Sequence, residues 1–293
     1  MQRRVLNETQ AMMRNVPMSS REWRELVDAE DTIFVSNEAG ALALVSVEGE
    51  SRLYWSFPGI DELRGSFKAL FDELRPSLEE LDASFVSTDL VEFLNRDWVL
   101  PVLRDADFEF FSEWMELVHP QLDDTVPEFP GGVTMRRAGD DDLERIEEIW
   151  LAAPGDLGDD LSAFDHYVEE ASWAGALTSD DDGSIVAFAL NGPADGPEGR
   201  IFAASVAPEA RGHGYGRAVL QAAMYQLASQ GSVRARIRVR PDVPRALRIA
   251  SDLGFRQERA GLEYRRINDE QALAERRETR RVAGVKVRFG DWR

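Results

Sequence analysis

The stretch that decides the fold reads Val206-Ala-Pro-Glu-Ala-Arg211-Gly-His-Gly-Tyr-Gly216, and Arg-Ala-Val-Leu-Gln-Ala-Ala follows directly. An apolar run over residues 201–206 enters a turn at Pro208, and the pattern after Gly216 predicts an amphipathic helix. Three glycines alternate within the turn. Glycine lets main-chain N–H groups converge on an anion without an obstructing Cβ, and a helix N-terminus adds partial positive charge. The stretch therefore predicts a strand, a turn and a helix that together hold a diphosphate.

Two other phosphate-binding motifs fit this stretch less well. The dinucleotide motif Gly-x-Gly-x-x-Gly requires an acidic residue about 20 residues further on, at the end of the next strand. Here the glycines alternate, and the next predicted strand (233–239) carries arginines. A P-loop is excluded because no Lys-Ser/Thr pair follows the glycines. A glycine-rich turn without a ligand remains as the alternative.

The pattern Arg-x-x-Gly-x-Gly after Val-x-Pro resembles the acetyl-CoA-binding signature of the GNAT acetyltransferase superfamily. Residues 211–216 match it at each fixed position. A second pattern of that family is Asn-x-x-Ala-x-x-Leu-Tyr-x-x-x-Gly-Phe, where this chain has Val243-Pro-Arg-Ala-Leu-Arg-Ile-Ala250-Ser-Asp-Leu-Gly-Phe255. Ala250 replaces the tyrosine that commonly protonates the leaving CoA thiolate in the family, so the resemblance leaves that role without a residue.

The composition bounds the remaining possibilities. The chain has 293 residues and a formal net charge of −20, which argues against nucleic-acid binding. It has no cysteine, which excludes disulfides and thiolate ligands, and three scattered histidines argue against a metal site. No apolar run reaches the roughly 18 residues of a membrane span, and no signal-peptide pattern opens the chain. We therefore expect a cytoplasmic protein that binds no metal, membrane or nucleic acid.

The length suits two domains of roughly 130 residues each. Val126-Pro-Glu-Phe-Pro-Gly-Gly132 predicts a linker, because two prolines and two glycines forbid a regular element. The expected organisation is a first domain over 1–126, a linker over 127–132, a second domain over 133–267 and a basic tail over 268–293. In the second domain, periodicity predicts strands over 133–137, 174–177, 185–190, 200–206, 233–239 and 261–266, and helices over 140–151, 161–173, 217–230 and 244–253.

In the first half, we predict strands over 32–36, 40–47, 51–57, 85–87 and 98–103, and helices over 61–81 and 90–95. This order repeats the second half from its hairpin onward. However, Phe57-Pro-Gly-Ile60 has one glycine and no arginine where the second half has its glycine-rich turn. We interpret the first half as a degenerate GNAT-like copy without cofactor, similar to the tandem arrangement of the mycothiol-synthase type. The resemblance implies an α/β (α+β) fold in which each domain has a mixed, mostly antiparallel sheet flanked by helices; an unrelated α+β cap is the alternative for the first half.

The resemblance also implies roles for the residues around the turn. Residues 204–206 are expected to lie along the pantetheine arm of acetyl-CoA, with the N–H of Val206 as the oxyanion donor, and residues 211–217 are expected to wrap the diphosphate. Arg217 is in addition a candidate for the adenosine 3′-phosphate. The expected cofactor-binding residues are Ala204, Ser205, Val206, Arg211, Gly212, His213, Gly214, Tyr215, Gly216 and Arg217.

Acetyl transfer to an amine requires orientation of the reactants, stabilisation of an oxyanion and management of one proton. The strand before the turn contains no acid, and Ser205 is its only polar side chain. Asp165 and Glu169 share a face of the predicted helix 161–173, although a solvated helix face explains them equally well. Tyr264 is a candidate to replace the hydroxyl missing at Ala250. The catalytic candidates are thus Ser205, Asp165 and Tyr264, and catalysis by proximity alone is the alternative.

Four arginines alternate with apolar residues between Val233 and Arg240, so a strand presents all four on one face. Like charges in register repel unless acids oppose them. We therefore expect a contact with acidic residues of the other half, or a phosphate contact at the Arg240 end.

These observations predict an N-acyltransferase that moves an acetyl group from acetyl-CoA to a primary amine of a small molecule. A non-catalytic acyl-CoA-binding or sensing protein is the first alternative, because of Ala250 and the missing strand acid. A surface for a partner, formed by the arginine strand and the basic tail, is the second. The expected assembly is a monomer with pseudo-dimeric halves or a homodimer.

Overall fold

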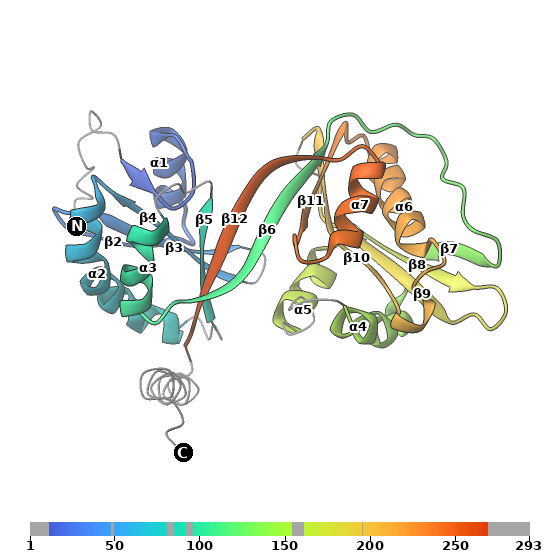
Figure 1. The fold of residues 1–293 in the computed structure, drawn as a ribbon, viewed down its shortest axis with the longest axis horizontal. Helices are drawn as coiled ribbons and strands as arrows, with labels where there is room; N and C mark the ends of the chain where they lie inside the picture. The colour runs from blue at the N-terminus through green and yellow to red at the C-terminus, as the bar shows by residue number, and fades with distance from the viewer. Residues whose placement is uncertain are drawn as a thin grey trace, which may run out of the picture. The chain divides into compact units, whose positions relative to one another are not determined.

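The computed structural model describes residues 12–47, 50–80, 85–91, 96–153, 161–194 and 196–268. These residues form two compact units (Figure 1). The C-terminal unit is Ser112–Gly261, and the N-terminal unit comprises the described residues up to Phe111 together with those from Leu262 onward. Each unit has a mixed sheet flanked by helices, which confirms the predicted fold class. No helix within the described ranges is long and apolar enough to cross a membrane.

The sheet of the C-terminal unit has the strand order β6-β11-β10-β9-β8-β7. Neighbouring strands are antiparallel except for the parallel pair β10 and β11. The strands, in this order, are Glu109–His119, Arg234–Val239, Glu198–Val206, Ile185–Asn191, Trp173–Ser179 and Val133–Arg137.

Helices cover both faces of this sheet, as the alternation along β9 shows. Ala187 and Ala189 pack in one cluster with α6 (Tyr215–Ser229) and α7 (Pro244–Asp252). Phe188 and Leu190 point to the other face, where they pack with α4 (Leu143–Leu151) and α5 (Leu161–Glu170). The buried face of α6 includes three alanines, whose small side chains let the helix approach the sheet closely. Packing on both faces holds the turn between β10 and α6 in place.

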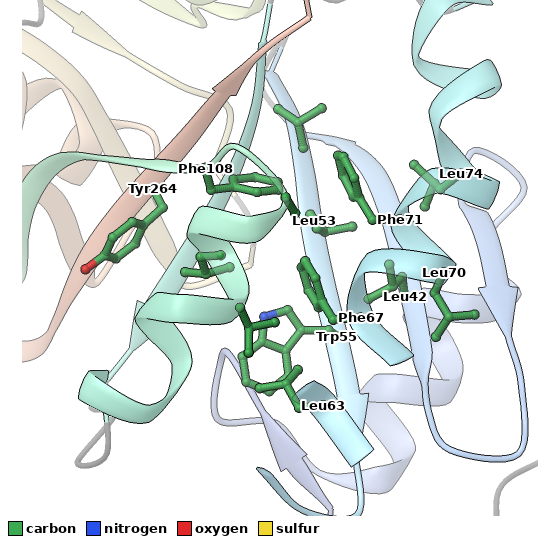
Figure 2. Close-up of a cluster of buried hydrophobic side chains, with 14 of the residues drawn as sticks. Leu42, Leu53, Trp55, Leu63, Phe67, Leu70, Phe71, Leu74, Phe108 and Tyr264 are labelled. Carbon is green, nitrogen blue, oxygen red and sulfur yellow. The ribbon is translucent and has the colours of Figure 1, made fainter. Parts of the chain in front are cut away.

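The N-terminal unit has the strand order β2-β3-β4-β5-β12, and the short β1 pairs with β4. Its core is rich in aromatic rings, and the fully buried Phe71 and Phe108 meet edge to face at 5.3 Å (Figure 2). The strands β1, β2, β3, β4, β5 and β12 are Met13–Arg14, Ile33–Ser36, Ala41–Val47, Glu50–Phe57, Phe85–Val91 and Arg256–Ile267, and the helices α1, α2 and α3 are Ser20–Asp28, Ile60–Glu80 and Arg96–Asp105.

The two halves of the sequence exchange their last strands. The order β4-α2-β5-α3-β6 in the first half matches β10-α6-β11-α7-β12 in the second. However, β6 pairs with β11 in the C-terminal unit, and β12 lies next to β5 in the sheet of the N-terminal unit. The units therefore divide the chain at Phe111 and Gly261, rather than at the ends of the ranges 1–126 and 133–267 expected from the sequence.

The segment 126–132 contains neither helix nor strand, as its prolines and glycines predict, but it belongs to the C-terminal unit rather than lying between units. The expected tail lies outside the described residues apart from Asn268.

Two predicted elements were wrong, and one predicted helix ends earlier than expected. The expected strand 98–103 is part of helix α3, where Val99, Val102 and Leu103 are buried at helical spacing while Trp98 is exposed. Leu90 and Val91 of the expected helix 90–95 belong to β5, and the next residues of that range lie outside the described residues. The helix expected over 161–173 ends at Glu170, and Trp173 begins β8.

Candidate functional site

The turn between β10 and α6 presents a row of main-chain N–H groups without acceptors. Within the described part of the chain, no acceptor contacts the N–H groups of residues 212–216. The first N–H groups of a helix have no partner inside the helix, and the first main-chain bonds of α6 are those of Arg217 and Ala218 to Gly214. The first turn of α6 also has no acidic side chain that would satisfy these donors. The site is therefore suited to bind an anion from outside.

Two glycines give the turn its shape. Gly212 has φ +97° and Gly214 has φ +86°, a region that L-residues rarely adopt. A Cβ at Gly212 would meet nothing within 4 Å, and one at Gly214 would meet only Pro130 at 3.9 Å. Space outside the turn is therefore open, and it is the backbone angle that requires glycine at both positions.

The strand that leads into the turn has one open edge. β10 and β11 pair only from Glu198 to Ile201, opposite Arg234 to Ile237. Beyond Ile201, β10 continues to Val206 on β9 alone, and its other edge has no strand partner among the described residues. Ala204 is accordingly exposed although it lies within a strand. The two parallel strands thus separate beside residues 204–206.

Main-chain groups of β10 alternate between its two edges. Ala207 donates to Val186 at 2.9 Å, so the groups of Ser205 also face β9, while those of Ala204 and Val206 face the open edge. In agreement, the carbonyl of Val206 accepts a bond from Arg211 Nε at 3.3 Å. The N–H of Val206 therefore points outward from the open edge of β10, away from β9, which is the direction that an oxyanion donor requires.

The side chains of the turn mostly support it. Arg211 donates to the carbonyls of Val206 and, at 2.7 Å, of Ala152 after α4, so its guanidinium ties the turn to both elements. His213 Nδ1 lies 3.2 Å from the carbonyl of Ala210, and its ring stacks on Tyr215 at 5.6 Å. The anion-binding capacity of the turn therefore resides in its main chain.

A pocket of about 630 Å³ lies along α6 beside this turn. One side of it is formed by Arg217, Gln221, Met224 and Tyr225, which recur at helical spacing. The rest of the lining includes residues 122, 123 and 125–128. Arg217 is half exposed, with Nη1 4.0 Å from an Asp252 carboxylate oxygen. This loose pair leaves the guanidinium available to a second anion.

The catalytic candidates lie in different places. Ser205 is on β10 within the site, and Asp165 is exposed on α5 of the same unit. Tyr264 instead belongs to the N-terminal unit, where its ring packs on Phe110 at 5.9 Å and its hydroxyl points away from the core (Figure 2). Ala250 is on the buried face of α7 and is 1% exposed, so this position offers no hydroxyl. The position at which the resemblance places the general acid is therefore occupied by an alanine, which cannot donate a proton.

Sequence reasoning missed an aromatic pair beside the open edge. Tyr167 of α5 stacks on Phe202 of β10 with ring centroids 4.8 Å apart, at the register shift of the strand. The ring of Trp150 meets Tyr167 edge to face at 5.8 Å. Helical spacing from Phe164 was the available signal, since it places Tyr167 on the apolar face of α5.

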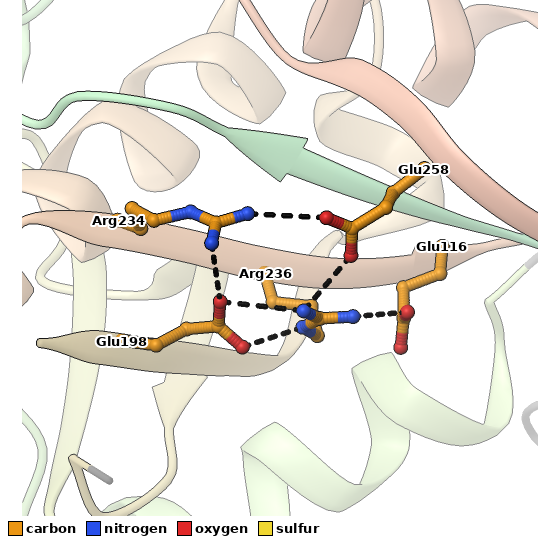
Figure 3. A network of polar contacts seen from close by, with 5 residues as sticks. All are labelled: Glu116, Glu198, Arg234, Arg236 and Glu258. Carbon is orange, nitrogen blue, oxygen red and sulfur yellow. Dashed lines mark hydrogen bonds and ion pairs between the residues drawn. The ribbon is translucent and has the colours of Figure 1, made fainter. Parts of the chain in front are cut away.

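Two arginines of β11, Arg234 and Arg236, are opposed by glutamates (Figure 3). Arg236 contacts three glutamates of the C-terminal unit: Glu198 of β10 at 2.7 Å, Glu258 at the start of β12 at 2.9 Å, and Glu116 of β6. Burial lowers the pKa of Arg236, but the hydrogen bonds and charges of these glutamates outweigh it and leave the pKa above its ordinary value. Arg234 shares Glu198 and Glu258 at 3.6 and 3.1 Å.

The other two arginines of the predicted alternation, Arg238 in β11 and Arg240 directly after it, have different partners. Arg238 lies over the ring of Trp114 at 4.2 Å, and Arg240 pairs with Asp242 at 2.7 Å. Glu116 belongs to the first half of the sequence, so the expected contact with that half exists because β6 joins this sheet.

A family model and a curated relative each match about half of the chain or less. Residues 141–255 match the family model described as the acetyltransferase (GNAT) family, and this range contains the whole turn and the open part of β10. Mycothiol acetyltransferase of Thermobispora bispora is 31% identical over 162 residues, which cover 48% of this chain and 52% of that protein. The chain therefore spans about half the length of the curated relative that it matches.

Solved structures share the fold over most of the chain. A GCN5-related N-acetyltransferase from Sphaerobacter thermophilus has a TM-score of 0.57 at 17% identity, covering 85% of this chain and 84% of its own. One from Kribbella flavida has a TM-score of 0.54 at 22% identity, covering 84% and 92%. A tandem GNAT protein from the clavulanic acid biosynthesis pathway has a TM-score of 0.54 at 14% identity, covering 82% and 84%. At these identities the likeness shows the fold.

Proposed function

We propose that this chain is an acyl-CoA-dependent N-acetyltransferase that transfers the acetyl group of acetyl-CoA to a primary amine of a small molecule. The observation that carries the proposal is the row of N–H groups without acceptors at residues 212–216, next to the open edge of β10. A diphosphate fits the first feature and an extended amide-containing arm fits the second. The family match over residues 141–255 supports the same chemistry.

The three parts of acetyl-CoA find places of matching chemistry. The diphosphate would accept bonds from the N–H groups of residues 212–216. The pantetheine arm would lie along residues 204–206, whose outward main-chain groups can bond its amides. The adenosine end would lie toward the pocket along α6, with Arg217 at the 3′-phosphate.

The reaction requires few side-chain groups of the protein. The amine nitrogen attacks the thioester carbonyl carbon, the C–S bond breaks, and the proton lost by the amine goes to water or to the departing thiolate. The N–H of Val206 would donate to the oxygen as negative charge develops on it. Orientation of the two reactants supplies the remaining acceleration, because a well-aligned bound pair reacts as one molecule. Catalysis then depends on the backbone of β10 and the turn.

A non-catalytic acyl-CoA-binding protein is the second candidate. The observation that favours it is Ala250, which is buried in the core and offers no hydroxyl. Such a protein would bind acetyl-CoA at the same site without transferring the acetyl group.

Release of CoA from acetyl-CoA across a panel of polyamines, amino sugars and amino acids separates the two candidates. A thiol reagent reads free CoA without background, because the chain has no cysteine. The proposal expects release that depends on the enzyme and on one class of amine. Tight binding of acetyl-CoA with no release on any amine would support the second candidate, and no binding at all would contradict both.

A further inference from the structure

The N-terminal unit has a gap between two parallel strands like the gap beside β10. β4 and β5 pair only at Ser51 with Val86 and at Arg52 with Ser87. Beyond Arg52, β4 leaves β5 but stays paired with β3 as far as Ser56. The corresponding strands β10 and β11 part in the same way after Ile201. Both units therefore contain the strand separation that the proposed function uses for an acyl-CoA arm.

In the N-terminal unit, the chain itself occupies this gap. β1 pairs antiparallel with the end of β4, with Met13 opposite Phe57 and Arg14 opposite Ser56. The next residue reaches the other strand, because the N–H of Val91 at the end of β5 donates to the carbonyl of Asn15 at 2.9 Å. Residues 13–15 thus bridge the two separated strands.

The side chain of Asn15 completes the bridge. Its Oδ1 accepts from the N–H of Trp55 at 2.9 Å, and its Nδ2 donates to the carbonyl of Leu53 at 3.1 Å and to Thr88 Oγ1 at 3.2 Å. Asn15 is only 1% exposed, and its amide satisfies outward-facing groups of β4 as a peptide group would. Counting back from the end of each strand, Trp55 occupies the place in β4 that Ala204 occupies in β10.

The first strand of each half takes a different position. β7 pairs with β8 along its whole length, from Val133 to Arg137. β1 instead pairs with β4 on the edge that faces β5. The first turn of α2 also carries Asp61 and Glu62, whose charges repel an anion at the helix end where the first turn of α6 has no acid. Two independent features thus close the N-terminal unit to an acyl-CoA.

We propose that residues Met13–Asn15 fill, in the N-terminal unit, the cleft that corresponds to the acyl-CoA cleft of the C-terminal unit, so that each chain binds one acyl-CoA. Asn15 is the positioning residue that holds the segment between β4 and β5. The correspondence of the two clefts rests on the proposed function, whereas the position of the segment does not.

Hydrogen exchange on the chain without ligand tests the position of the segment. The amides of Trp55 and Val91 are expected to be protected in the wild type and to exchange at least about tenfold faster in Asn15→Ala. Trp55 loses its acceptor, the side-chain Oδ1, directly, whereas Val91 donates to the main-chain carbonyl of residue 15, so its faster exchange reports that the segment leaves β5. Asn37→Ala is the matched control, since Asn37 Oδ1 accepts from Ala39 and Gly40 in an exposed turn of the same unit. Equal exchange of the two amides in all three proteins would overturn the proposal.

A disulfide tests whether the segment ever leaves. The chain has no cysteine, so Arg14→Cys combined with Ser56→Cys creates a single pair at directly opposed strand positions, a separation that a disulfide can span. Native mass spectrometry is expected to show one acetyl-CoA per chain in both the oxidised and the reduced protein. Two per reduced chain and one per oxidised chain, or failure of the pair to form, would overturn the proposal. Absence of any bound acetyl-CoA would contradict the proposed function, and hydrogen exchange would still decide the position of the segment.

Discussion

Gly212 shows how one residue can decide a binding site without contributing a side chain. Its φ of +97° turns successive N–H groups toward the same open space, and an alanine would strain that conformation. Gly183 provides a comparison within the same unit, because it has φ +73° and lies in the turn between β8 and β9, where a Cβ would likewise meet nothing within 4 Å.

Gly212→Ala and Gly183→Ala are expected to lower the free energy of unfolding by similar amounts, about 1 kcal/mol each, since both place a side chain at positive φ. Only Gly212→Ala is expected to weaken acetyl-CoA binding, by about tenfold, because tilting one or two N–H groups costs about 1.4 kcal/mol. Titration calorimetry and urea unfolding measure the two effects. Equal affinities of the two variants for acetyl-CoA would show that the turn is not part of the binding site.

Arg217 is the one side chain of the region with a specific expected partner. Arg217→Ala is expected to weaken binding of CoA about tenfold and binding of 3′-dephospho-CoA less than about twofold, because only the first carries the phosphate that the guanidinium would bond. Arg248→Ala, which removes an exposed arginine of α7 that does not line the pocket, is the control for net charge. A similar loss for both ligands would place Arg217 elsewhere on the cofactor.

At this scale, the sequence predicts backbone roles better than side-chain roles. Glycines at alternate positions before a helix have few uses other than a turn of open amides, so residues 212–216 could be placed from their pattern. Tyr264 could not be placed in this way. Alternation within a strand predicts the face on which a side chain lies, but not the sheet that the strand joins. Arg211 shows a similar limit. The motif suggests that its guanidinium binds phosphate, but in the structure the guanidinium donates to the main-chain carbonyls of Val206 and Ala152.

Among the elements, β11 carries a network of ion pairs with neighbouring strands. Its Arg236 has a side chain 20% exposed and faces three glutamates, so its removal leaves carboxylates that repel one another. Arg236→Met is expected to lower the free energy of unfolding at pH 7 by about 2 kcal/mol, and Arg234→Met, at a side chain 40% exposed, by less than about 1 kcal/mol. Urea unfolding monitored by circular dichroism measures both. Equal effects would show that the contacts of Arg236 are too solvated to matter.

The effect of Arg236→Met is also expected to depend on pH. The hydrogen bond from Arg236 lowers the pKa of Glu198 in the folded chain. A carboxylate with a lowered folded pKa stabilises the fold above its unfolded pKa of about 4.3, and this contribution disappears as the pH falls through the folded value. The difference between wild type and Arg236→Met should therefore be full at pH 7 and smaller below about pH 4. A difference that does not change across this range would exclude the ion pairs as its source.

Periodicity predicted most elements of the C-terminal unit, because strands between two helical layers and amphipathic helices have distinct repeats. It was wrong at residues 98–103, where a short run of β-branched and aromatic residues is compatible with either period. The burial of Val99, Val102 and Leu103 against α2 decides for the helix, and sequence alone does not contain that contact.

For the whole molecule, the exchange of β6 and β12 is the feature that the sequence could not reveal. A strand carries its face pattern in its residues, but its partner is chosen by the complete set of edges available in the folded chain. The repeat of element order between the halves favours two self-contained domains, and the boundaries expected at 126 and 133 followed from it. The structure instead places the last strand of each half in the sheet of the other unit.

This exchange makes the two halves of the sequence dependent on each other. Separation of the chain within 122–130, which contains no helix or strand, gives one fragment ending after β6 and another that carries β12. Alone, each fragment lacks the last strand of its own sheet and exposes an apolar edge at β5 or β11, so we expect it to aggregate. Expressed together, the fragments are expected to recover a one-to-one complex, because each supplies the strand that the other lacks.

Size-exclusion chromatography with light scattering measures the complex, and acetyl-CoA binding reports the C-terminal unit. The same separation between Asn37 and Glu38, in the exposed turn between β2 and β3, is the control, because it divides neighbouring strands of one unit and leaves β5, β6, β11 and β12 together on one fragment. A monomeric, cooperatively folded fragment from residue 127 onward that binds acetyl-CoA alone would contradict the dependence. It would show that β12 can turn back onto β11 of its own half, and that the exchange is one of two closures of nearly equal free energy.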